Sequence, residues 1–72
     1  MFKLDSVINM RNFILSRGFD VLPIKKADNE YKAIIFRGEK SMGEGKIIYK
    51  TWQSALETTE KTIYERLNEY DK

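Results

Sequence analysis

The stretch that most constrains the fold is residues 51–70, which have the apolar pattern of an amphipathic helix. At 3.6 residues per turn, one set of side chains falls inside an arc of roughly 80°. The members of this stripe are Trp52, Leu56, Thr59, Ile63, Leu67 and Tyr70. The opposite side is polar and includes Glu57, Glu60 and Lys61, and Thr51 stands where an N-cap is needed. We therefore expect a C-terminal helix with one buried face, anchored chiefly by Trp52.

Length and missing residue types limit what the chain can do. Its 72 residues make a single domain, residues 1–72, with a small core. There is no cysteine and no histidine, which excludes disulfides, thiolate or imidazole metal ligands and a nucleophile activated by histidine. We expect no enzyme activity, no cofactor and no metal. Without cysteine, a signal peptide or an apolar run of about 18 residues, a cytoplasmic protein outside the membrane is predicted.

A first helix is predicted near the N-terminus. Asp5 or Ser6 can cap it, and it runs to about Arg17, where Gly18 supplies the left-handed residue that ends many helices. Its apolar surface covers more than half of its circumference. The residues of this surface are Leu4, Val7, Ile8, Met10, Phe13, Ile14 and Leu15.

This wide apolar surface has two interpretations. In the first, the helix is packed between a sheet and the C-terminal helix, and Arg11 extends its charged head to water. In the second, part of the surface, Phe13 with Met10, contacts another chain.

Three strands are predicted between the helices, at residues 20–26, 31–37 and 46–50. Pro23 cannot donate a ladder hydrogen bond, so the first strand should lie at a sheet edge. Asp28 and Asn29 suit a tight turn after it. The second strand is apolar on both faces, as a central strand is. A glycine-rich loop at residues 38–45 then leads to the third strand.

These elements predict an α+β fold: a helix, a three-stranded antiparallel meander and a helix, with both helices on one face of the sheet. The central strand offers two apolar sets, Ala33 with Ile35 and Ile34 with Phe36. The set that faces the helices cannot be decided from periodicity.

The expected function is that of a small, non-catalytic accessory or regulatory module that binds protein, including a second copy of itself. The residues predicted to contact a partner are Phe13, Met10, Met42 and Ile48. Pairing of residues 46–50 across a two-fold axis would give a homodimer with a six-stranded sheet. Lys46 and Lys50 on one face of that strand oppose such pairing.

The alternative is a nucleic-acid binder. The net charge of +2 is weak for that class, but residues 1–50 hold 10 basic and 6 acidic side chains. The cations that would contact phosphates are Lys25, Lys26, Lys32, Arg37, Lys40, Lys46 and Lys50.

Two resemblances bear on these alternatives. A Gly-Glu-Gly segment at residues 43–45 precedes the third strand, and a helix begins soon after it. With the order helix, sheet, helix, this resembles the double-stranded RNA-binding domain. The lysine cluster with which that family binds phosphates is replaced at residues 50–54 by Lys-Thr-Trp-Gln-Ser, and its Gly-Pro-x-His loop is absent. The resemblance therefore implies a topology but no binding residues.

The second resemblance rests on a hairpin followed by Thr-x-x-x-Ala-Leu, here residues 51–56. This is similar to small uncharacterised proteins of bacteria, phages and mobile elements. It covers about a third of the chain and implies an accessory protein from such a genome, without any activity.

Overall fold

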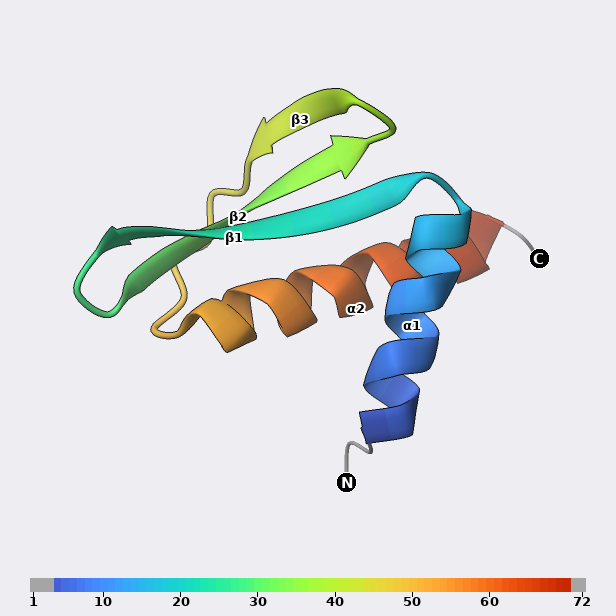
Figure 1. Ribbon diagram of the computed structural model, residues 1–72, viewed down its shortest axis with the longest axis horizontal. Coiled ribbons are helices and arrows are strands. Elements are labelled where there is room, and N and C mark those ends of the chain that lie inside the picture. Colours follow the sequence, from blue (N-terminus) through green and yellow to red (C-terminus); the bar gives the residue numbers. More distant parts are fainter. Residues whose placement is uncertain (1–3, 71–72) are drawn as a thin grey trace.

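The protein folds as a helix, a three-stranded antiparallel sheet and a second helix (Figure 1). The computed structural model describes residues 4–70, and the side chains of residues 8–69. The side chains of Leu4, Val7 and Tyr70, which belong to the predicted apolar faces, lie outside this description. The elements are α1 (Leu4–Ser16), β1 (Phe19–Ala27), β2 (Glu30–Arg37), β3 (Lys40–Glu44) and α2 (Trp52–Tyr70). The predicted α+β class and the order of its elements are confirmed.

Both helices contribute to one core on one side of the sheet. α2 runs along β1 and β2, and α1 packs against α2 and β1 (Figure 1). The buried apolar residues come from all of these elements. They are Ile14, Val21, Ala33, Ala55 and Ile63.

α1 ends at Gly18, as predicted. Gly18 has a φ of +86°, a left-handed conformation that other residues rarely adopt. The amides of Arg17 and Gly18 donate hydrogen bonds to the carbonyls of Ile14 and Leu15. The carbonyl of Gly18 accepts a bond of 2.7 Å from the amide of Gly38. This last bond ties the end of α1 to the turn between β2 and β3.

The sheet has the order β1-β2-β3, so β2 is central, as predicted. Pro23 therefore lies on an edge strand, where the sheet does not need an N–H donor at this position. Asp28 and Asn29 form the turn between β1 and β2, and Asn29 has a φ of 57°, which asparagine tolerates. These two sequence predictions are also confirmed.

The strand register shows which apolar set of β2 faces the helices. Val21 pairs with Ile35, and both Val21 and Ala33 are buried in the core. Side chains alternate between the two faces along a strand. Leu22 and its partner Ile34 therefore lie on the opposite face, away from α2.

The prediction of a third strand at residues 46–50 is wrong, because β3 lies within the predicted glycine-rich loop. Of the predicted segment, Tyr49 forms an isolated bridge with Tyr31, through hydrogen bonds of 2.7 and 2.8 Å. Lys40 pairs with Arg37 at the other end of β2. The chain advances nine residues from Lys40 to Tyr49, whereas β2 advances only six residues between the partners of these two, Arg37 and Tyr31. The three extra residues bulge out of the sheet. The alternating pattern of residues 46–50 did not reveal these bulges.

α2 begins where expected, but it is not anchored by Trp52. The hydroxyl oxygen of Thr51 accepts a hydrogen bond of 3.1 Å from the amide of Ser54, as an N-cap does. Ala55 is fully buried one turn later, and Ile63 is buried further along. Trp52 is 55% exposed, so its predicted role is wrong. Trp52 is the first residue of α2 and lies outside the buried stretch of the helix, which begins at Ala55.

Glu60 was expected on the solvent side of α2, and this is also wrong. Its side chain is only 4% exposed, and its two oxygens accept hydrogen bonds from Nε and Nη2 of Arg11 at 2.6 and 3.1 Å. The hydrogen bond to Glu60 is the main cause that raises the pKa of Arg11 above its ordinary value. Arg11 therefore joins α1 to α2 instead of simply extending into water.

We predict that Ile14→Ala destabilises the fold far more than Trp52→Ala does. Ile14 is 1% exposed at the centre of the core, so its truncation should cost about 2 to 5 kcal/mol. Trp52→Ala should cost about 0.5 to 1 kcal/mol, as surface substitutions do. Urea unfolding followed by far-UV circular dichroism measures both. Equal losses would show that Trp52 is part of the core.

We also predict that removing one partner of the Arg11–Glu60 ion pair lowers the free energy of unfolding more than replacing both partners by apolar residues does. Arg11→Met leaves the buried Glu60 carboxylate unpaired and should cost about 2 kcal/mol, below the full value for buried pairs because Arg11 stays partly in water. Adding Glu60→Met removes the second charge and should recover most of this loss. If the double variant is no more stable than Arg11→Met in urea, Glu60 is not held as described.

Candidate interaction surfaces

The face of the sheet opposite the helices is apolar at its centre. We call it the outer face and define it by Leu22, Ile24, Ile34 and Phe36, which the register of β1 and β2 places on one side. Leu22 is 49% exposed, and its three companions are half-buried by one another and by their neighbours. Within residues 4–70, neither helix covers this face. An uncovered apolar sheet face is a candidate site for a partner.

Charged side chains stand at both ends of the outer face. The central pair of the outer face is Leu22 with Ile34. Asp20 lies two residues before Leu22 on β1, and Lys32 lies two residues before Ile34 on β2, so the antiparallel pairing places them on opposite sides of the central pair. Nζ of Lys26 also forms an ion pair of 2.9 Å with Oε1 of Glu44. Because β1 and β3 are not neighbours, this pair spans β2. Glu44, which pairs with Ile34 on β2, is thus neutralised by Lys26, and this leaves Asp20 at one end of the face and Lys32 at the other.

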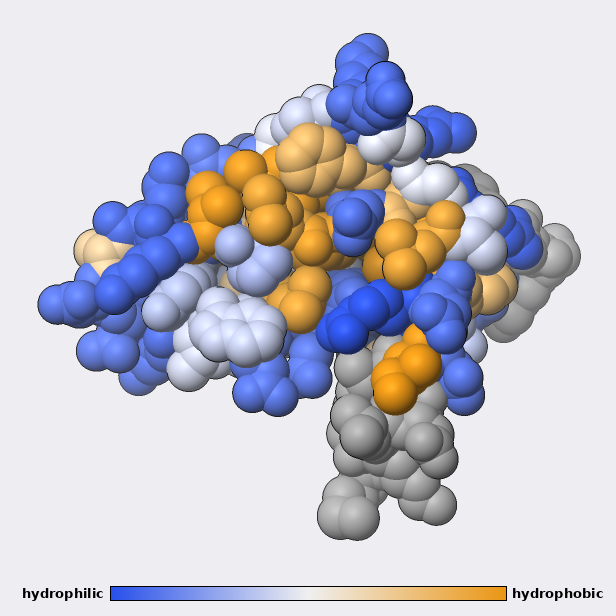
Figure 2. Space-filling view, viewed as in Figure 1, coloured by the Kyte–Doolittle hydropathy of each residue, from blue (hydrophilic) through white to orange (hydrophobic). Residues whose placement is uncertain are grey.

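A second apolar surface lies on the helix side, between α2 and the part of the sheet that carries β3. Two hollows, of about 150 Å³ and about 420 Å³, meet there at Ile35. We call their union the helix-side groove. Its apolar lining includes Phe19, Met42, Ile47, Ile63 and Leu67. In the view of Figure 2, apolar surface gathers over β1 and β2.

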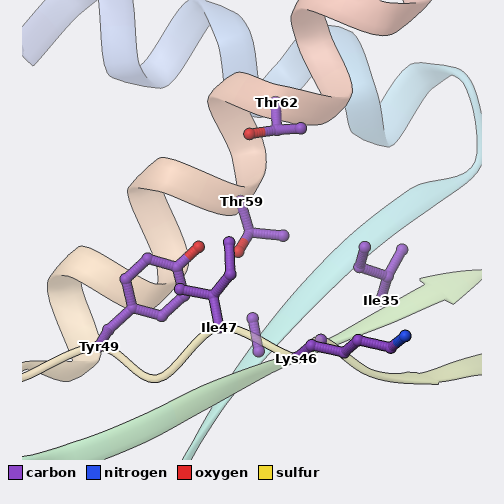
Figure 3. A pocket seen from close by; sticks show the side chains of 8 residues that line it. Ile35, Lys46, Ile47, Tyr49, Thr59 and Thr62 are labelled. Atoms are coloured by element: carbon purple, nitrogen blue, oxygen red, sulfur yellow. The ribbon is translucent and has the colours of Figure 1, made fainter.

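The chain between β3 and α2 forms one wall of this groove. Figure 3 shows the side chains of Ile47 and Tyr49 directed toward α2, where Thr59 and Thr62 face them. Gly45 donates a hydrogen bond of 2.8 Å to the carbonyl of Ala33, which fixes the start of this wall against β2. Ile47 lies two residues before Tyr49, which bridges Tyr31 on the helix side of β2, so both side chains fall on the side of α2.

Two of the four residues predicted to contact a partner are accessible. Met42 is 61% exposed and lines the helix-side groove. Ile48 is exposed in the connection between β3 and α2. The structure therefore leaves both of them available to a partner.

The other two residues lie on α1 and are less accessible. Met10 is half-buried. Phe13 packs edge-on against Tyr64, with ring centroids 5.2 Å apart, and the guanidinium of Arg17 lies 4.9 Å from its ring. Phe13 is thus engaged within the chain, which favours the first of the two interpretations of the wide α1 surface.

The seven cations predicted for nucleic-acid binding are not gathered on one face. Lys32 lies on the outer face, whereas Arg37 lies on the helix side, 5.6 Å above the ring of Phe19. Lys25 and Lys26 form ion pairs with carboxylates. The remaining three are exposed on β3 or on the connection that follows it: Lys40, Lys46 and Lys50. Such a spread does not favour a continuous track for a phosphate backbone.

Sequence reasoning had not assigned Leu22, Ile24, Ile34 and Phe36 to a surface. The period of two placed them on one face of their strands, but on β2 the opposite set, Ala33 with Ile35, was also apolar. Ile47 was not identified as a surface residue because it was placed within a predicted strand. The signal for the bulges is that more residues lie between two paired positions on one strand than on its partner. This signal can be recognised only when the register of the strands is known.

Neither helix in the described part of the chain has the length and the hydropathy needed to cross a membrane. Residues 4–70 also contain no group of three or more carboxylate, histidine or cysteine side chains placed to hold a metal ion. Comparisons with models of protein families, with curated proteins and with solved structures found no match for the chain. The resemblances to the double-stranded RNA-binding domain and to small hairpin-plus-helix proteins therefore stay predictions.

Proposed function

We propose that this chain is a small, non-catalytic interaction module of the cytoplasm that associates with a second copy of itself through its outer face. The observation that carries the proposal is the apolar pair Leu22 and Ile34 at the centre of a sheet face that neither helix covers in the described residues. Burial of apolar surface contributes about 25 cal/mol per Å². Pairing of residues 46–50 between copies has no comparable support, since that segment is not a strand.

The charges at the ends of the outer face are self-complementary. Consider a two-fold axis that lies in the plane of the interface and runs perpendicular to the strands. It places the second copy face to face with the first and reverses the direction of its strands. The Lys32 end of each copy then lies over the Asp20 end of the other. Two attractive contacts flank the apolar centre, and they also set the orientation of the two sheets.

The size of the outer face indicates a weak dimer. Three strands about 4.8 Å apart span about 14 Å, and the eight residues of β2 extend over about 26 Å. The contact therefore covers about 370 Å² per copy, less than half of the roughly 800 Å² of a stable complex. We expect association at high concentration, or when a larger assembly brings copies together.

Leu22→Lys should abolish self-association without harming the fold, because the side chain lies half in water and a charge would be buried on association. Sedimentation equilibrium up to millimolar concentration should show the wild-type mass rising from 8.5 kDa toward twice that value, and Leu22→Lys staying constant. Met42→Lys is the matched control, since it places the same charge at an exposed apolar site on the opposite side of the sheet.

A constant wild-type mass over this range contradicts the proposal, as does an equal loss in both variants. In a parallel gel-shift assay at low salt, binding of double-stranded RNA that Lys40→Glu with Lys46→Glu weakens would favour the nucleic-acid alternative instead.

The charged ends should decide the orientation of the dimer. Lys32→Asp places carboxylates at both ends of the outer face and should weaken association, most clearly at low salt. Adding Asp20→Lys exchanges the two signs and should restore it. Sedimentation of the single and the double variants measures the effect. Equal association of the wild type and Lys32→Asp at low salt would show that the two ends do not meet.

A further inference from the structure

The helix-side groove exists because one helix is too narrow for the sheet. α2 packs on β1 and β2, and within the described residues no Cα atom of β3 lies within 8 Å of one in α2. A helix with its side chains is about 10 Å wide, whereas three strands span about 14 Å. Met42 on β3 therefore lies beside α2 rather than under it, and Ile35 on β2 lines the hollow between them.

The length of the groove matches a short helix. Along α2 its lining runs from Thr59 to Leu67, which is about 12 Å at 1.5 Å per residue, or two to three turns. The opposite wall is formed by Met42 and Ile47, on β3 and on the connection that follows it. A helix lying parallel to α2 would place side chains at positions i, i+3 or i+4, and i+7 into both hollows.

The charged groups that line the groove are all cationic. Arg37 and Arg66 line the larger hollow, and Lys46 lines the smaller one. Among the described side chains, no carboxylate lines either hollow. Lys40 pairs with Arg37 in the sheet and adds to this rim. Glu65 and Glu69 lie on the other side of Arg66, where they line a separate polar hollow of about 480 Å³.

We infer that the helix-side groove binds an amphipathic helix with acidic flanks, supplied by a partner protein. Its apolar stripe covers Ile35, Met42 and Ile47, completing the second layer of the sheet beneath β3. Its Asp and Glu side chains contact Arg37 and Arg66, which can each bind a carboxylate in a bidentate manner. This site lies on the opposite side of the sheet from the proposed dimer contact, so one does not depend on the other.

Peptides of stated chemistry test the inference. The probe is a fourteen-residue amphipathic helix with Leu at the stripe positions and Glu on both flanks. One control has the same Leu positions with Lys in place of Glu, and a second keeps the composition but scrambles the order. We expect the acidic peptide alone to shift the amide resonances of Ile35, Met42 and Ile47 in ¹⁵N spectra, with saturable binding that weakens as salt is added.

Charge-matched variants locate the contact. Arg66→Glu should weaken the acidic peptide at least tenfold, because it reverses a charge on the rim. Lys61→Glu makes the same change of net charge at an exposed position of α2 that lines neither hollow, and it should alter binding less than twofold. Far-UV circular dichroism checks that both variants keep the fold.

Several outcomes would overturn the inference. They are no saturable binding of the acidic peptide, equal binding of the basic peptide, equal losses in Arg66→Glu and Lys61→Glu, and shifts confined to Leu22 and Ile34. If dilution of the protein alone shifts Met42 and Ile47, a second copy occupies the groove. If double-stranded RNA competes with the peptide for the same resonances, the arginines bind phosphate.

Discussion

The close contact of α2 with the sheet at two alanines governs the shape of this small domain. Ala33 on β2 and Ala55 on α2 are both buried, and neither has a side chain beyond Cβ. The helix can therefore approach the sheet closely, and Ile14 from α1 and Ile63 from α2 complete the core. Trp52, Ile47 and Met42 lie outside this contact and remain largely exposed.

Local signals in the sequence predicted the elements and their order. The period of 3.6 in residues 51–70, the proline in β1, Gly18 and the turn residue Asn29 each act within a few positions of the chain, and they correctly predicted a helix, an edge strand, a helix end and a turn. The errors concern contacts between distant residues. Glu60 has the polar character of an exposed helix position, yet its partner Arg11 lies 49 positions away. No property of either residue alone indicates that the two meet.

The candidate surfaces could be predicted only in part. Met42 was identified in the glycine-rich segment and Ile48 in the predicted third strand, and both are exposed in the structure. The outer face could not be chosen, because β2 is apolar on both sides and only packing against α2 distinguishes them. The groove depends on the bulged path between Lys40 and Tyr49, and therefore on a register that periodicity does not contain.

The bulges beside β2 have a consequence for how copies of this chain can aggregate. A long, regular free edge is a template on which further strands add without limit, as in amyloid. Here one edge strand contains Pro23, and the other is a five-residue strand that begins with a lysine and pairs irregularly between Ser41 and Glu44. Both edges are thus poor templates, while the faces stay apolar. Association through a face related by a two-fold axis stops at two copies, so this arrangement permits self-recognition without a route to open-ended fibres.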